Sequence, residues 1–416
     1  MKSWDSPTLP SLGTGGLVPS IFNSSSGELQ PATVSDTAQM YVCGITPYDA
    51  THLGHANTYL AYDTLNRALR DAGIKVHYVQ NVTDVDDPLL ERAKSTGADW
   101  SQLAQTQIEL FRTDMQALRI LPPDEYVGVV ETIQNIAEAC KQLLESGFAY
   151  WVESEDGKAD LYFDCRVAEQ NSAWKLGEVS GLTPGEMIAL FTERGGDPDR
   201  LGKRNRLDPL LWRAKRENEP SWSTTIGEGR PGWHIECSVI GAKFLDAPIQ
   251  LCGGGSDLLF PHQEMSAAHS AALLGKRWSQ CYSNAGMLHL DGEKMSKSRG
   301  NLVFVSSLLR EGIDPRVIRL ALLNHHYRSD WEWQQADLDH AKGRLNRWLN
   351  WSASRFQETK STDSNFALVK AMRNAVSNDL DTPSALELVD WRVLSETPAS
   401  AIELAAINAL LGIELD

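Results

Sequence analysis

The sequence has no long hydrophobic run, no excess of basic residues and no closely spaced pair of cysteines. No apolar segment approaches the roughly 20 residues that cross a bilayer, and no basic segment followed by an apolar core opens the chain. We therefore expect a cytoplasmic protein with no membrane partner. Lys and Arg total 39 against 55 Asp and Glu, a net charge of −16. This balance disfavours a protein that coats itself in nucleic acid, although it allows a local basic patch.

The six cysteines form no C-x-x-C pair, so a disulfide framework is not expected. Each thiol is first interpreted as a small buried hydrophobic side chain. A chain of 416 residues is long for a single core, so two to three domains are expected. The cysteines are Cys43, Cys140, Cys165, Cys237, Cys252 and Cys281.

Two segments far apart in the chain show the pattern strand, helix, strand. Residues 38–44 and 74–82 predict buried strands, and residues 55–73 between them have apolar side chains at helical spacing. Such a βαβ unit implies parallel strands joined by a right-handed crossover. The second unit lies at residues 247–255, 262–275 and 279–286. The fold class is therefore α/β, with one open parallel sheet split by an insertion.

The expected division of the chain follows from these units. The first segment is rich in Ser, Pro, Gly and Thr and is expected to be loosely ordered. Within the insertion, residues 149–164 predict a β-hairpin. The divisions are a lead-in at 1–37, the first half of the sheet domain at 38–121, the insertion at 122–206, the second half at 207–290, a loop and stem-contact-like region at 291–345, and a helical bundle at 346–416.

Ligands of open parallel sheets bind beyond the carboxyl ends of the strands. After the first strand comes HLGH, residues 52–55, which opens a helix whose free N–H groups favour an anion. Alone, this motif is weak evidence. The segment DGEKMSKSRGN, residues 291–301, would alone be interpreted as a solvated loop. Both together, in this order around a split sheet, form a far more specific signal.

With these two elements the sequence resembles class I aminoacyl-tRNA synthetases, whose signatures are written HIGH and KMSKS. The resemblance implies a Rossmann-like catalytic domain with a connective insertion and a C-terminal helical bundle. It also implies that ATP is a substrate accompanied by Mg²⁺. The implied catalytic residues, which surround the charge on the phosphates, are His52, His55, Lys294 and Lys297.

The stretches YVCG, NVTDVDD, RPGWHIECS, GGGSDLLFPH and KMSKSRGN resemble the cysteinyl branch of these enzymes. That resemblance implies one Zn²⁺ per chain, with Cys43, Cys237 and His262 as ligands. Zinc can select cysteine because it binds the substrate thiol as thiolate. Ser266 stands where the synthetases typically carry a further ligand. Three protein ligands would leave the fourth position open for the substrate.

The same resemblance implies a set of residues that bind cysteine or its adenylate. Thr83 and Trp233 match positions that line the cysteine pocket, although ordinary core packing is the alternative for both. Asp257 would bind the ribose hydroxyls and Leu288 the adenine through its backbone. The full set is Cys43, Gly44, Ile45, Thr46, Thr58, Asn81, Val82, Thr83, Trp233, Gly255, Ser256, Asp257 and Leu288.

Several departures from the cysteinyl pattern bear on the acceptor of the cysteinyl group. The chain reads PHQEMS where the synthetases typically read PHHENE, and only 118 residues follow Ser298, which is short for a tRNA-reading domain. These departures, with ERGGDP at residues 193–198, resemble the synthetase-derived ligases of mycothiol biosynthesis. Those enzymes join cysteine to the amine of glucosaminyl-inositol (1D-myo-inositol 2-amino-2-deoxy-α-D-glucopyranoside).

The resemblance thus implies an ATP-dependent ligase that forms cysteinyl-AMP and then an amide, releasing AMP and pyrophosphate. We expect a monomer with small-molecule substrates and without tRNA. A cysteinyl-tRNA synthetase and a catalytically inactive cysteine-binding regulator remain as alternatives. The sequence names neither the residues that hold the acceptor nor the base that deprotonates its amine.

Overall fold

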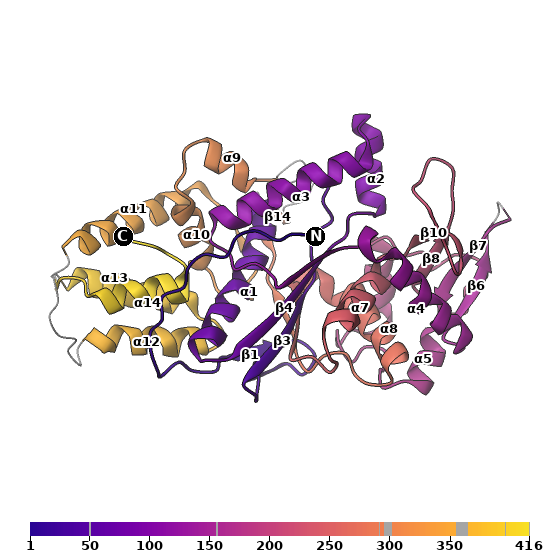
Figure 1. Ribbon diagram of the computed structural model, residues 1–416, viewed down its shortest axis with the longest axis horizontal. Coiled ribbons are helices and arrows are strands. Elements are labelled where there is room, and N and C mark those ends of the chain that lie inside the picture. The colour runs from indigo at the N-terminus through magenta and orange to yellow at the C-terminus, as the bar shows by residue number, and fades with distance from the viewer. Residues whose placement is uncertain are drawn as a thin grey trace.

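The computed structural model describes residues 1–49, 51–154, 157–290, 292–294, 302–354, 365–395 and 397–415. At its centre lies a five-stranded parallel sheet with the order β12-β11-β3-β4-β5 (Figure 1). Helix α1 (Leu53–Asp71) connects β3 to β4, and α8 (Glu264–Leu274) connects β11 to β12. Both predicted βαβ units are therefore confirmed. The strands are β3 (Thr37–Val42), β4 (Lys75–Val82), β5 (Glu125–Gly128), β11 (Leu251–Gly255) and β12 (Tyr282–Ala285).

The central sheet is covered on both faces, because side chains alternate along its strands. On β3, Met40 and Val42 belong to one hydrophobic core, while Tyr41 and the following Cys43 belong to the other. The first core includes α1 and the C-terminal helices, and the second includes the insertion with α7 and α8. Parallel sheets are buried in this way on both sides. The arrangement is the Rossmann-like α/β fold that the sequence predicts (Figure 1).

The insertion forms a second sheet of five antiparallel strands, with the order β6-β7-β8-β10-β9. Its first two strands pair as the predicted hairpin. β5 pairs with β4 of the central sheet, and β8 and β10, which follow residue 206, belong to the same sheet as β6 and β7. The strands are β6 (Ala149–Glu153), β7 (Ala159–Phe163), β8 (Leu210–Ala214), β9 (Trp222–Thr224) and β10 (Gly227–Pro231).

The C-terminal helices lie together at one end of the molecule, and the insertion's sheet lies at the opposite end (Figure 1). The helices between β4 and β11 are α2 (Asp87–Thr96), α3 (Trp100–Ala117), α4 (Ile133–Glu145), α5 (Cys165–Asn171), α6 (Pro184–Glu193) and α7 (Trp233–Phe244). The C-terminal helices are α9 (Val305–Arg310), α10 (Pro315–Leu323), α11 (Gln335–Ala353), α12 (Asn365–Ser377), α13 (Thr382–Leu394) and α14 (Ala401–Leu411). A small sheet joins β13 (Leu288–Leu290), β14 (Glu293–Lys294) and β15 (Trp331–Glu332).

The prediction that residues 1–37 are loosely ordered is wrong. β1 (Ser20–Asn23) and β2 (Glu28–Pro31) pair antiparallel within this segment. Trp4 is buried against Phe111 and Tyr126, and its indole N–H donates to the carbonyl of Ile120 at 2.7 Å. The few apolar residues of the segment find partners far away in the chain, which composition does not reveal.

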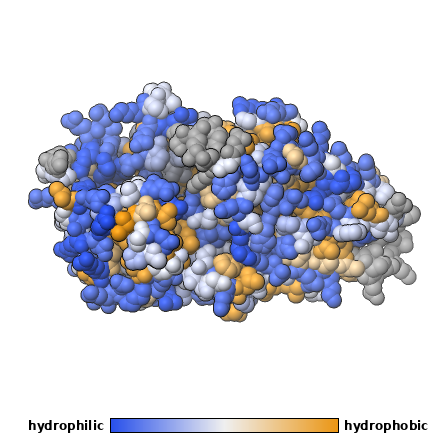
Figure 2. All heavy atoms as spheres, turned by 180° about the vertical axis from the view of Figure 1, so that it is seen from behind, coloured by the Kyte–Doolittle hydropathy of each residue, from blue (hydrophilic) through white to orange (hydrophobic). Residues whose placement is uncertain are grey.

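Among the described residues, no helix is both long and apolar enough to cross a bilayer. On the face seen in Figure 2, hydrophilic residues predominate and the hydrophobic ones form separate patches.

A fully buried carboxylate joins α1 to the C-terminal helices. Asp63 of α1 lies 2.8 Å from Nε of Arg67 and also pairs with Arg319 of α10. Arg319 in turn donates to the carbonyls of Leu118 and Leu411, at 2.7 and 2.6 Å. Burial raises the pKa of Asp63, but the two guanidinium groups lower it below its usual value. The carboxylate therefore stays charged and ties three helices together.

The substitution Asp63→Ala should lower the free energy of unfolding by about 3–5 kcal/mol, because it leaves two arginines buried without a counter-charge. Equilibrium urea unfolding followed by circular dichroism measures the change. Asp5→Ala, which removes an exposed carboxylate 4.0 Å from Lys2, should change it by less than about 0.5 kcal/mol. Equal stability of both variants would contradict the role given to Asp63.

Candidate metal centre and nucleotide cavity

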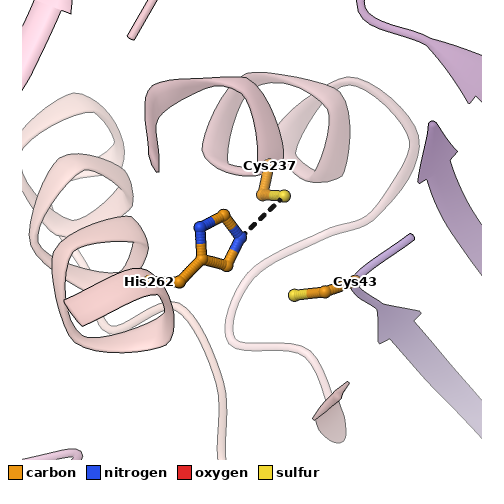
Figure 3. A group of neighbouring side chains, drawn as sticks. All are labelled: Cys43, Cys237 and His262. Atoms are coloured by element: carbon orange, nitrogen blue, oxygen red, sulfur yellow. Dashed lines mark hydrogen bonds between the residues drawn. The ribbon is translucent and has the colours of Figure 1, made fainter. Parts of the chain in front are cut away.

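Three predicted metal ligands converge beyond the carboxyl end of the central sheet (Figure 3). Cys43 directly follows β3, Cys237 lies on α7, and His262 lies in the short helix η3 (Leu259–Gln263) between β11 and α8. All three are buried, and their ligand atoms lie within 4.8 Å of one another. Nε2 of His262 is 3.1 Å from Sγ of Cys237. Residues 194 and 25 positions apart thus form one donor set.

The electrostatics of the donor set favour a bound cation. Burial raises the pKa of Cys237, but the hydrogen bond from Cys43 and the imidazole of His262 lower it well below its usual value. The pKa of Cys43 is raised, first by its hydrogen bonds to Cys237 and Cys252 and then by burial. Two cysteine sulfurs and an imidazole nitrogen are a donor set of tetrahedral zinc sites, whose bonds are about 2.0–2.3 Å long.

The hydroxyl of Ser266 has a different partner from the donor set. It donates to the carbonyl of His234 at 2.9 Å, and the carbonyl of Ser266 accepts from Ser238 at 2.9 Å. His234 is a neighbour that the sequence analysis missed, although it lies in the quoted stretch RPGWHIECS. Its Nδ1 is 3.1 Å from Nδ1 of His262, so it can orient that ring. Burial, followed by the charge of His262, lowers the pKa of His234 well below its usual value.

Asn81 holds the strand end that carries Cys43. Its carboxamide oxygen accepts from the N–H of Gly44 at 2.8 Å and from the hydroxyl of Tyr41 at 3.1 Å, and its nitrogen donates to Thr83 at 3.2 Å. A Cβ on residue 44 would lie 1.6 Å from the carbonyl oxygen of Asn81, so only glycine fits there. Asn81 therefore acts as a brace between the ends of β3 and β4.

A cavity of about 270 Å³, called here the first cavity, opens beside Cys43. His52 and His55 line this cavity, and their rings stack with centroids 3.7 Å apart. His52 also caps the N-terminus of α1, because its side chain accepts from the N–H of His55. Predicted site residues in its lining are Cys43, Gly44, Ile45, Thr46, His52, His55, Thr58, Trp233, Gly255, Asp257 and Leu288.

The remaining predicted residues lie elsewhere. Asn81, Val82, Thr83 and Ser256 are absent from the lining of the first cavity; Val82 is fully buried in the sheet. Lys294 lies in β14, and Lys297 falls outside the described residues. The lining residues that the sequence analysis missed are Tyr48, Asp49, Gly54, Tyr59, Leu258, Gly286, Met287 and Leu302.

Several of these missed residues flank motifs already quoted. The hydroxyl of Tyr59, one residue after Thr58, donates to the carbonyl of Cys43 at 3.1 Å. Tyr48 and Asp49 lie in the polar turn before HLGH. Their position in that turn, between the first strand and HLGH, could have identified them as lining residues from the sequence.

Comparison with known proteins gives consistent relationships. Residues 30–343 match the family model described as the catalytic domain of tRNA synthetases class I (C). The chain is 53% identical to the L-cysteine:1D-myo-inositol 2-amino-2-deoxy-alpha-D-glucopyranoside ligase of Clavibacter michiganensis subsp. michiganensis, over 100% of this chain and 99% of that protein. It is 50% identical to the protein of the same name from Nakamurella multipartita, over the full length of both.

Two solved structures share the fold at low sequence identity. The methionyl-tRNA synthetase of Mycobacterium tuberculosis, in complex with methionyl-adenylate, has a TM-score of 0.62 and 17% identity, over 90% of this chain and 88% of that chain. The LeuRS of Agrobacterium radiobacter K84, in a ternary complex, has a TM-score of 0.58 and 12% identity, over 91% and 83%.

Removing the brace should affect both stability and metal binding. Asn81→Ala leaves the N–H of Gly44 without its acceptor and removes one hydrogen-bond partner of the Tyr41 hydroxyl, which should lower the free energy of unfolding by about 1–3 kcal/mol. Bound metal, measured by elemental analysis after dialysis, should also fall. Asn171→Ala removes an exposed amide at the end of α5 and should leave both quantities unchanged. Full metal retention by Asn81→Ala would contradict the brace.

Proposed function

We propose that this chain uses ATP to join L-cysteine to the amine of glucosaminyl-inositol. The chain belongs to the class I (C) tRNA synthetase family and, within it, to the L-cysteine:1D-myo-inositol 2-amino-2-deoxy-alpha-D-glucopyranoside ligases. The observation that carries the proposal is the place of Cys43. It belongs to a buried Cys–Cys–His donor set and also lines the cavity beside HLGH. A group that binds cysteine's thiol and a site for an adenylate thus share one wall.

In the first step the cysteine carboxylate attacks the α-phosphorus of ATP, and pyrophosphate leaves. The protein's part is to position the reactants and stabilise the developing charge. His52 and His55 lie at the N-terminus of α1, where backbone N–H groups favour phosphate. Asp257 is placed to bind the ribose hydroxyls, and Leu288 to contact adenine through its backbone. We assign Lys294 and Lys297 to the phosphates and Mg²⁺ to the ATP.

Cys43, Cys237 and His262 would hold one zinc ion, which supplies a binding site for the cysteine thiol as thiolate. Serine cannot match this interaction because its hydroxyl does not ionise comparably. The ring of Trp233 lies 4.5 Å from that of His262 and closes this side of the pocket. Since Ser266 donates to the carbonyl of His234, we assign three protein ligands to the ion.

In the second step the amine attacks the carbonyl carbon of cysteinyl-AMP. The bond from that carbon to the phosphate oxygen breaks, AMP leaves, and an amide forms. Starting from the ammonium form of the acceptor, two protons are released. One leaves before the attack and one leaves the nitrogen as the amide forms.

We further propose that the protein works as a monomer in the cytoplasm, where ATP is present and thiols stay reduced, and that it uses no tRNA. A cysteinyl-tRNA synthetase would catalyse the same first step, so only the acceptor separates the two functions.

The test therefore offers both acceptors. The purified protein should catalyse cysteine-dependent exchange between ATP and pyrophosphate without any added acceptor. With ATP, cysteine and glucosaminyl-inositol it should form the cysteinyl amide, detected by mass spectrometry, and with tRNA in place of glucosaminyl-inositol it should form no aminoacyl ester. Charged tRNA without amide would establish the synthetase instead, and absence of exchange would overturn both.

The zinc assignment has its own test. The purified protein should contain about one zinc ion per chain by elemental analysis, and Cys237→Ala should lose both the ion and the discrimination against serine. Cys281→Ala, which removes a buried thiol outside the donor set, should keep the zinc. A Cys237→Ala protein that retains stoichiometric zinc would refute the ligand set.

A further inference from the structure

A second cavity, of about 600 Å³, adjoins the first. Thr46, Tyr48 and Trp233 line both, so these three residues form a shared wall. The rest of the second cavity lies between the start of α2, the end of α6 with the segment after it, and the junction of β10 with α7. Its volume falls in the range of about 300–1,000 Å³ that is typical of small-molecule sites.

The stretch ERGGDP has no role in the formation of cysteinyl-AMP as proposed above. It forms one side of the second cavity. Five of its six residues, Glu193 to Asp197, belong to the lining. Within the stretch, Arg194 donates to the carbonyls of Asp257 and Phe260. The insertion is therefore attached to the segment that carries both the ribose-binding carboxylate and His262.

Three of the four arginines in the lining of the second cavity pair with carboxylates. The fourth, Arg194, donates to the two carbonyls just described, which satisfy its N–H groups but carry no net charge. Arg200 lies 2.8 Å from Asp160, and Arg213 lies 3.1 Å from Glu219. Arg230 pairs with both Asp87 and Glu219. Among the described lining residues, Arg194 alone brings a positive charge that is not paired with a carboxylate.

Three carboxylates in the same lining lack a cationic partner within hydrogen-bond distance. Glu91 and Glu193 form no hydrogen bond or ion pair within the part of the chain that the structure describes. Asp86 accepts from the backbone N–H of Asp87 at 2.8 Å, as the N-cap of α2. The cavity therefore offers uncompensated negative charge, which suits a cationic ligand.

Asp86 is the N-cap of α2 and lies four residues after Val82, the last residue of β4. Burial raises its pKa to about 6, opposed by the N–H of Asp87 and by the nearby Arg230 and His262. Glu91 lies more than one helical turn further along α2.

We propose that the second cavity binds glucosaminyl-inositol, with its amine toward the shared wall and its ammonium charge facing Asp86 and Glu193. This inference rests on the proposed function. The amine must reach the carbonyl carbon of cysteinyl-AMP, and the shared wall is where the two cavities meet. The hydroxyls of the sugar and inositol rings find charged donors and acceptors along the lining, which form stronger hydrogen bonds than neutral groups do. The first cavity, which is smaller, is taken up by the adenylate.

The test separates the two half-reactions in two variants. Asp86→Asn removes a charge but keeps the side-chain oxygen that caps α2, because Asn caps helices as well as Asp does. Glu193→Gln removes a charge from an exposed side chain at the end of α6. Each should raise the KM for glucosaminyl-inositol about tenfold or more. The KM values for ATP and cysteine in the exchange reaction should stay within about twofold of wild type.

A matched control and a second measurement complete the design. Glu153→Gln changes an exposed glutamate of the same insertion, on β6, outside both cavities, and should leave both half-reactions unchanged. Binding of glucosaminyl-inositol, measured by calorimetry on protein saturated with a non-hydrolysable cysteinyl-adenylate analogue, should weaken further in Glu193→Lys than in Glu193→Gln.

The outcomes distinguish this inference from the function on which it rests. If the wild-type protein forms no amide from glucosaminyl-inositol, the proposed function fails. If it forms the amide but Asp86→Asn and Glu193→Gln keep the wild-type KM for the acceptor, the assignment of the second cavity is overturned and the function stands. Loss of the exchange reaction in both variants would also overturn the assignment, because these residues would then serve the adenylate.

Discussion

All five strands of the central sheet run parallel, so they end at one edge, and the remainder of the structure depends on that constraint. Cys43 follows β3, Thr83 follows β4 and Asp257 follows β11, which brings a thiol, a buried hydroxyl and a carboxylate to this edge. The backbone is packed tightly there. Gly253 lies against the ring of Tyr62, where a Cβ would approach to 2.4 Å, and Tyr62 accepts from the N–H of Gly254 at 2.6 Å. The strand ends are held in position before any ligand arrives.

Helix α1 transmits support from the C-terminal helices to this edge. Its N-terminus carries His52 and His55, and its middle carries Asp63, which pairs with Arg319 of α10. The helix is held at its N-terminus as well as at Asp63, since the N–H of Leu53 donates to the carbonyl of Val303 at 2.8 Å. The C-terminal region therefore contributes to the placement of the two histidines. Of its described residues, only Leu302 lines either cavity.

The insertion forms part of the second cavity, on the far side of the shared wall from the first. On the near side lie Cys43 and HLGH. The far side is lined by residues of the insertion together with the start of α2, and Arg194 of the insertion donates to the carbonyls of Asp257 and Phe260. These two hydrogen bonds attach the insertion to the segment that follows β11.

The sequence by itself determined the alternation of strands and helices, the buried faces of β3 and β4, and the motifs that resemble a class I cysteine-activating enzyme. These features are local, because side-chain periodicity and short motifs involve residues that are close together in the sequence. The predicted metal ligands follow from the resemblance alone, since spacings of 194 and 25 residues carry no signal of their own.

Only the tertiary structure decided which distant residues meet. The packing of Trp4 on Phe111, the pairing of β8 with β7, the attachment of Ser266 to the carbonyl of His234 and the second cavity all join segments that no local pattern connects. Such contacts depend on how whole elements pack, because each side chain's environment is set by residues remote in the chain.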